Sequence, residues 1–141
     1  DIVGQDCGTH LHVGIRYGRT KSIVDGYWHP LFAPLTDHMM DNYQETVEFW
    51  GRSFNGYAAN GRNGRYSWIN PYSRHNTMEY RVLKYQSKQQ YLRASRFCFV
   101  ITSMLDKLTY QHRAKDFIPG RKLDKLADSI LALYKEETAH V

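Results

Sequence analysis

The chain has 141 residues, 42% of them hydrophobic and 23% charged, and carries a formal charge of +5. This length and composition predict a globular domain with a core of its own. The sequence has no apolar run of the roughly 18 residues that a membrane span needs, and no signal-peptide pattern. We therefore expect no membrane association and no secretion by a signal peptide. The positive charge suits an anionic ligand but is too small to predict specific binding of nucleic acid.

The first predicted element is a buried strand over residues 8–16, which contains the segment Cys7-Gly8-Thr9-His10-Leu11-His12-Val13-Gly14. Successive side chains of a strand point to opposite faces, so His10 and His12 share one face and Leu11 and Val13 share the other. Two neighbouring imidazoles suit a divalent metal or a phosphate. The alternative is a pair of hydrogen-bonded histidines on a solvent-facing strand.

Residues 17–34 contain two glycines and two prolines, and we predict irregular structure there. Thr36 is a suitable N-cap, and apolar residues then recur at helical spacing, which predicts a helix over about 37–54. A glycine- and asparagine-rich loop follows at 56–64. Its Arg62 is a candidate ligand for phosphate or carboxylate, as is Arg52 at the end of the helix. A solvated Arg62 and an Arg52 that only complements the helix dipole are the alternatives.

Two strands are predicted near 65–70 and 77–84. The second reads Thr77-Met78-Glu79-Tyr80-Arg81-Val82-Leu83, and its alternation places Glu79 and Arg81 on one face. An acid beside a base suits a metal and a phosphate, although a cross-strand ion pair explains the same pattern. The polar faces of this strand and of the histidine strand should lie on the same side of the sheet.

The remaining chain predicts helices over about 87–112 and 121–137, separated by a break at Phe117-Ile118-Pro119-Gly120. Residues 113–141 are interpreted as a C-terminal helical extension used for packing or oligomerisation. The expected fold is α+β, with a curved, mainly antiparallel sheet, two to three helices packed on one face and a ligand on the other. Cys7 and Cys98 are the only cysteines, which favours a reducing compartment over a disulfide framework.

Three of these segments resemble motifs of one family. CGTHLHVG resembles the "CGxHxHVG" strand of the amidoligases, which are glutamine synthetase-like carboxylate–amine ligases. TMEYR resembles their later "TxEFR" strand, and the segment from Arg65 to Asn70 resembles the short "R-Y-x-x-x-N" strand between the two. The order and approximate spacing agree, over about residues 5–105.

The resemblance implies a glutamine synthetase-like half domain that uses ATP and Mg²⁺ to join a carboxylate to an amine through an acylphosphate. It implies that His10 and Glu79 contact a metal ion and that His12 helps hold the nucleotide. Arg81 would clamp phosphate and act in catalysis, together with Arg65. The carboxylate could belong to a small molecule or to a peptide.

The family's acidic metal ligands lie on strands before the histidine strand, and this sequence starts at Asp1, directly before that strand. We therefore expect a C-terminal portion of a larger ligase-like domain, completed by an N-terminal segment or by another chain. The alternative is a non-catalytic structural or assembly protein, such as a processed phage virion component, so the expected location is cytoplasmic or virion-associated. A metal hydrolase is disfavoured, because barrel hydrolases need about 250 residues.

Overall fold

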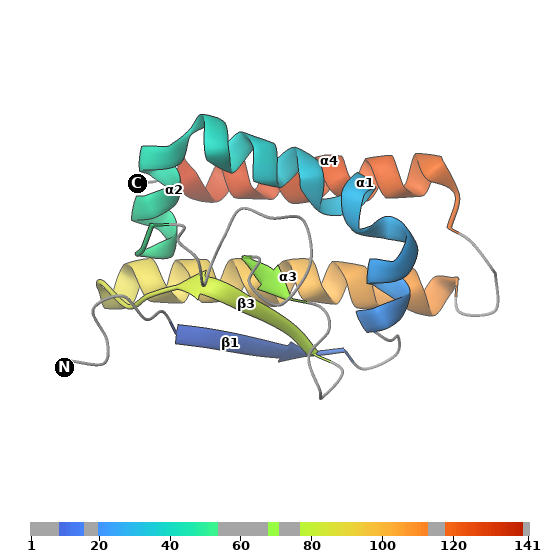
Figure 1. Cartoon of the computed structure of the whole chain (residues 1–141), viewed down its shortest axis with the longest axis horizontal. Helices are drawn as coiled ribbons and strands as arrows, with labels where there is room; N and C mark the ends of the chain where they lie inside the picture. Colours follow the sequence, from blue (N-terminus) through green and yellow to red (C-terminus); the bar gives the residue numbers. More distant parts are fainter. Residues whose placement is uncertain (1–8, 16–19, 54–67, 71–76, 113–117, 140–141) are drawn as a thin grey trace.

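The computed structural model describes residues 9–15, 20–53, 68–70, 77–112 and 118–139. Within these ranges the chain forms four helices and a three-stranded antiparallel sheet (Figure 1). The predicted α+β class and antiparallel sheet are confirmed. The number of helices is larger than the two to three that we predicted.

The sheet has the order β1-β3-β2, with β1 (Thr9–Gly14) and β2 (Ile69–Asn70) on either side of β3 (Thr77–Leu83). Glu79 of β3 lies opposite His12 on one side and opposite Asn70 on the other. The strands predicted over 8–16 and 77–84 are confirmed within one or two residues at each end. Of the strand predicted over 65–70, residues 65–67 lie outside the described residues.

Helix α1 (Thr20–Asp41) corrects the prediction that residues 17–34 are irregular, of which residues 17–19 lie outside the described residues. Pro30 and Pro34 each lack the amide hydrogen that a helix interior uses, which is why they were interpreted as breakers. Pro34 lies on the exposed side of the helix, whereas Leu31, Phe32 and Leu35 are almost fully buried. The burial of this apolar face outweighs the lost hydrogen bonds, because packing supplies most of a helix's stability in a protein.

The helix predicted over 37–54 is divided differently in the structure. Residues up to Asp41 belong to α1, and the remainder forms α2 (Tyr43–Trp50). Thr36 is not an N-cap: it lies within α1, where its hydroxyl donates to the Phe32 carbonyl and accepts from the indole N–H of Trp68. The local signal for an N-cap was present, but a buried threonine uses the same hydroxyl for tertiary hydrogen bonds.

The two predicted C-terminal helices are confirmed as α3 (Lys88–Gln111) and α4 (Gly120–Thr138). Ser87 is the N-cap of α3, and its hydroxyl accepts from the amide of Gln90 at 3.1 Å. None of the described helices is both long enough and apolar enough to cross a lipid bilayer.

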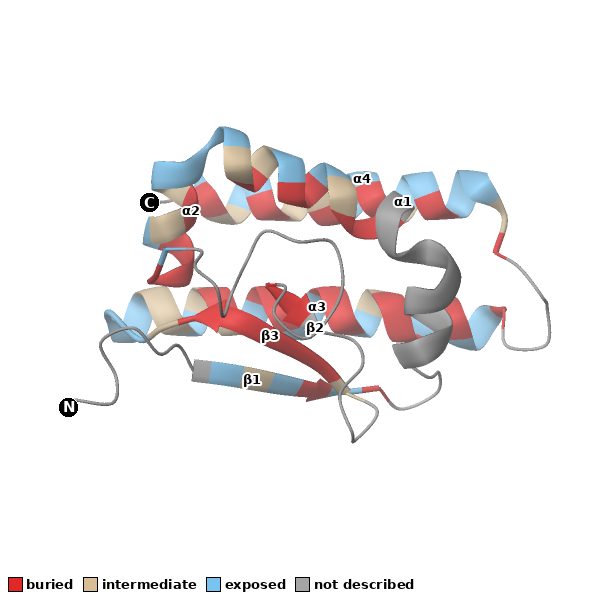
Figure 2. Ribbon diagram, viewed as in Figure 1, coloured by how far each residue is buried: buried red, intermediate tan, exposed pale blue. Residues whose placement is uncertain are grey.

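The helices form a second layer against the sheet. Helix α3 runs along one face of β1 and β3, and α4 packs on α1 and α3 (Figure 1). The core between the layers is rich in aromatic rings, and it appears as the red inner surfaces in Figure 2. These rings contact one another mainly edge to face. They come from every helix, from β3 and from the residue before β2, and are Phe32, Phe49, Trp50, Trp68, Tyr80, Phe97 and Tyr134.

The C-terminal end of α2 is hydrogen-bonded to the segment that runs from the end of β3 into the first turn of α3. Gly51 ends α2 in the left-handed region, with φ of 86°. The amide of Lys84 donates to the Trp50 carbonyl at 2.8 Å, and the side-chain amide of Gln86 donates to the Gly51 carbonyl at 2.8 Å. Gln90 adds a third bond, to the Phe49 carbonyl at 2.9 Å. We call these contacts the α2–β3 junction; they place Arg52 beside β3.

Candidate functional site

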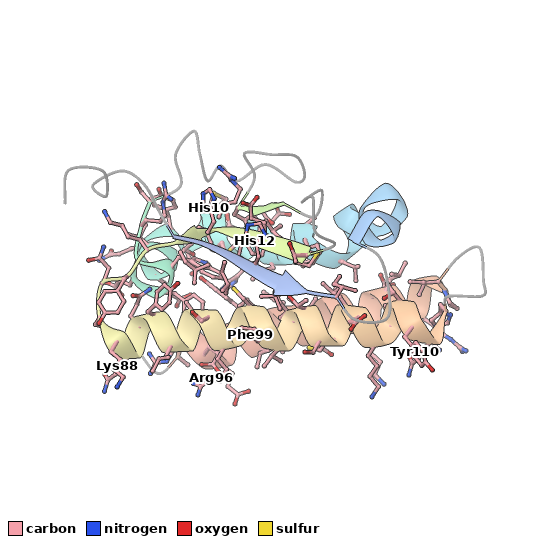
Figure 3. The ribbon with its side chains drawn as sticks, turned by 90° about the horizontal axis from the view of Figure 1, so that it is seen from below. His10, His12, Lys88, Arg96, Phe99 and Tyr110 are labelled. Carbon is pink, nitrogen blue, oxygen red and sulfur yellow. The ribbon has the colours of Figure 1, made fainter. Side chains whose placement is uncertain are left out.

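The two histidines of β1 lie on the sheet face opposite α3. His10 and His12 are exposed, whereas Val13 and Ile15 are buried in the core and Leu11 packs against it. Figure 3 shows both labelled histidines on the side of β1 that faces away from α3. The predicted alternation of the strand is therefore confirmed.

The carboxylate of Glu79 is the centre of a cluster of polar side chains. Its Oε2 lies 3.2 Å from Nδ1 of His10 and 3.3 Å from Nε2 of His12. Its Oε1 lies 3.3 Å from Nη1 of Arg81. The predicted common side for the polar faces of the two strands is thus confirmed by direct contacts between them.

Two arginines of the cluster are buried. Arg81 and Arg52 are each only 7% exposed. The guanidinium of Arg52 donates to the backbone carbonyl of Arg81 at 3.3 Å, so the two lie next to each other. With neutral histidines, Arg52, Glu79 and Arg81 together carry one net positive charge, and such a buried positive site favours an anion.

Thr77 orients the ring of His12. Nδ1 of His12 and the hydroxyl of Thr77 share a hydrogen bond of 2.9 Å, while Nε2 faces Glu79. In the neutral ring this network assigns the proton to Nε2, which donates to the carboxylate, and Nδ1 accepts from the hydroxyl. Sequence analysis did not single out Thr77, although its spacing of two residues from Glu79 was a usable signal.

The surroundings lower the pKa of His10 below its ordinary value of 6.5. The main causes are partial burial and then the positive charge of Arg81, while Glu79 acts in the opposite direction. His10 binds a proton less readily in the folded protein than in the unfolded chain. The free energy of unfolding therefore falls as the pH drops from the unfolded-chain pKa of His10 through its pKa in the folded protein. The lowered pKa therefore favours the neutral form of His10, which keeps a lone pair.

We expect the pKa of His10, followed by NMR of the ring protons, to lie below 6.5. Glu79→Gln should lower this pKa further, because it removes the one charge that favours the imidazolium. Arg81→Gln should raise it, because it removes the largest opposing charge. A wild-type His10 that titrates at or above its ordinary value would contradict this description of the cluster.

Among the described residues no group of three or more histidine, cysteine or acidic side chains is arranged to hold a metal ion. Glu79 offers carboxylate oxygens, which Mg²⁺ prefers, whereas imidazole nitrogen suits transition metals better. Mg²⁺ commonly binds one or two carboxylates and completes its shell with substrate phosphates and water. Among the described residues, Glu79 therefore offers a single carboxylate to a magnesium ion, which is too few for a resident site.

The other predicted site residues differ in how far the structure places them. Arg62 and Arg65 lie outside the described residues. The backbone of Asn70 pairs with Glu79 across β2 and β3. For Arg52 the sequence left two alternatives open, a ligand for phosphate or carboxylate and a residue that complements the helix dipole. The α2–β3 junction brings Arg52 to the cluster, and no spacing in the sequence predicted that contact.

Cys98 does not belong to the cluster. It is a fully buried free cysteine on the inner side of α3, and burial raises the pKa of its thiol well above the usual value. A thiol of this kind is inert, because the thiolate is the reactive form.

Comparison of the chain with protein-family models, with curated proteins and with solved structures finds no match. The resemblance to the amidoligases therefore depends on the three sequence motifs and stays a prediction.

Proposed function

We propose that this chain is part of an ATP- and magnesium-dependent carboxylate–amine ligase with a glutamine synthetase-like half domain. One observation carries the proposal. The resemblance assigns roles to His10 and His12 on one strand and to Glu79 and Arg81 on another, at least 67 residues later, and the four side chains touch in one cluster.

The cluster offers complementary groups to a nucleotide triphosphate. The guanidinium of Arg81 is a planar fork that suits phosphate oxygens, and the neighbouring Arg52 adds a second buried positive charge. His10 and His12 provide imidazoles at the exposed edge of the cluster. Glu79 would provide an oxygen ligand to magnesium that enters with the nucleotide.

The proposed reaction needs positioning and charge neutralisation more than a protein nucleophile. The terminal phosphoryl group of ATP passes to the carboxylate, which gives an acylphosphate and ADP. The amine then attacks the acyl carbon, forms the amide bond and releases inorganic phosphate. Arg81 and Arg52 would stabilise the negative charge that develops on the transferred group.

The proposed ligase also needs further oxygen ligands for magnesium and further residues to enclose the substrate. Strands β1 and β2 are the two edges of the described sheet, so each offers a row of backbone groups to another strand. We propose that another segment or another chain pairs there and supplies the remaining acidic ligands. The identity of the carboxylate and of the amine is not part of the proposal.

Calorimetric titration of ATP into the protein, with magnesium and with a chelator, tests this function. We expect saturable binding that requires magnesium. Arg81→Gln and Arg52→Gln should each weaken it about tenfold or more, because each removes a charged hydrogen-bond donor. Lys125→Gln on the exposed side of α4 is the matched control and should leave binding unchanged. An absence of magnesium-dependent binding, by this chain and by a longer protein that contains it, would reject the ligase and favour the structural alternative.

A further inference from the structure

One side of α3 is exposed along almost its whole length. Eight residues repeat at helical spacing on it and are all exposed; they are Lys88, Leu92, Arg96, Phe99, Val100, Ser103, Lys107 and Tyr110. We call this surface the outer face of α3. Figure 3 labels four of these residues along the helix on the side away from His10 and His12, so the surface is separate from the proposed ligase site.

Four of the eight residues of the outer face are large apolar or aromatic side chains. Leu92 is 55% exposed, Phe99 51%, Tyr110 42% and Val100 39%. In the described part of the chain the only other large apolar side chains that are exposed are Tyr43 and Tyr85. Phe99 and Val100 also line a shallow, mainly apolar hollow together with Ser103, Met104 and Lys107. Exposed apolar side chains that gather on one helix face are typical of an interaction site.

The charges on the same face all have one sign. Arg96 and Lys107 lie between the apolar side chains and Lys88 lies at the N-terminal end, and the described residues form no ion pair with any of the three. The one acidic residue of α3, Asp106, is buried. Arg93 pairs with Glu137 of α4 at 3.9 Å and does not belong to this face. A complementary surface must therefore combine apolar side chains with acidic ones.

We infer that the outer face of α3 is a docking surface for an acidic, amphipathic helix of a partner protein. Helix α3 is about 36 Å long, and its exposed apolar side chains Leu92 and Phe99 lie seven residues apart, two turns along the same side of the helix. Phe99 and Val100 would enter the apolar stripe of the partner. Arg96 and Lys107 would pair with carboxylates that flank that stripe.

Two other occupants suit this face less well. A second copy of the chain would bring three cations of each outer face against three of the other, and each chain already carries a net charge of +5. A helix that lies in a membrane interface separates its basic face from its apolar face. Here Arg96 and Lys107 are interleaved with Phe99, Val100 and Tyr110, so no wholly apolar stripe is available to enter lipid.

The probe is a displayed library of helical peptides of about 20 residues, long enough to populate a helix when bound. Its apolar stripe is fixed, and the flanking positions vary among Glu, Lys, Gln and Ser. Selection on the full chain should enrich glutamate. Fluorescence anisotropy of the selected peptides should show about tenfold weaker binding to Phe99→Ala. Arg96→Gln with Lys107→Gln should weaken binding and reduce its salt dependence, whereas Lys125→Gln should change neither.

Several results would overturn the proposal. These are no enrichment, enrichment of lysine or neutral residues, or peptides that bind Phe99→Ala as well as the wild type. Self-association seen by sedimentation, or binding to phosphatidylserine vesicles, that is lost in Phe99→Ala would assign the face to a second copy or to a membrane instead. Thermal unfolding checks each variant, and exposed substitutions of this kind should change stability by about 0.5 kcal/mol or less.

Discussion

Replacing Glu79 by alanine is expected to lower the free energy of unfolding by about 3 kcal/mol. Glu79 and Arg81 are both 7% exposed, and the carboxylate faces a guanidinium nitrogen and two imidazoles at 3.2–3.3 Å. Without the carboxylate, the buried charge of Arg81 loses a partner that it cannot replace with bulk water. The loss is therefore much larger than for an exposed ion pair, which contributes about 1 kcal/mol or less.

Urea unfolding at pH 7.5 measures this effect. Glu136→Ala, an exposed position on α4, makes the same substitution and should cost about 0.5 kcal/mol or less. Adding Arg81→Met to Glu79→Ala should recover part of the loss, because it removes the uncompensated charge. Equal free energies of unfolding for Glu79→Ala and Glu136→Ala would show that the Glu79 carboxylate does not stabilise the buried charge of Arg81.

Gly51→Ala should also cost about 3 kcal/mol, for reasons that concern the backbone. Gly51 has φ of 86°, a backbone conformation that residues with a Cβ rarely adopt. A Cβ at this position would also run into the backbone carbonyl of Lys84, which belongs to the α2–β3 junction. A rigid carbonyl cannot move aside, so the junction must open or shift.

Gly120→Ala is the matched control for this prediction. Gly120 is the first residue of α4, has an ordinary φ, and a Cβ added there meets no atom within 4 Å. Its replacement should be neutral or stabilising by a few tenths of a kcal/mol, since alanine favours helix. Comparison of the two variants by urea unfolding separates the junction from a general effect of adding a methyl group. Equal stabilities would contradict the importance of the left-handed cap.

The parts of the fold that the sequence predicted well are those with strong local periodicity. Helices α3 and α4 have long apolar stripes, and α3 also has Ser87 as its N-cap. Helix α1 could not be predicted in the same way, because Pro30 and Pro34 are unfavourable locally. Only the tertiary burial of Phe32 and Leu35 against the rest of the core makes that helix stable.

The contacts of the candidate site were likewise predictable only where they depend on local periodicity. Alternation along two strands predicted that His10 and His12 share a face and that Glu79 and Arg81 share a face, and both predictions are confirmed by contacts. Arg52 reaches the cluster only through the fold, because its position depends on hydrogen bonds from residues more than 30 positions later in the chain. The assigned functions of these side chains remain predictions.

The α2–β3 junction has a consequence for how the chain tolerates changes in length. It joins residues 49–51 to residues 84–90 by hydrogen bonds, and Arg52 and Arg81 both lie close to these bonds. The entropy of closing a loop grows only slowly with its length, by about 0.6 kcal/mol for each doubling. Insertions and deletions between residues 54 and 67 should therefore leave the spacing of the two arginines unchanged. Variants of this chain with such changes in length should keep the same pair of buried charges.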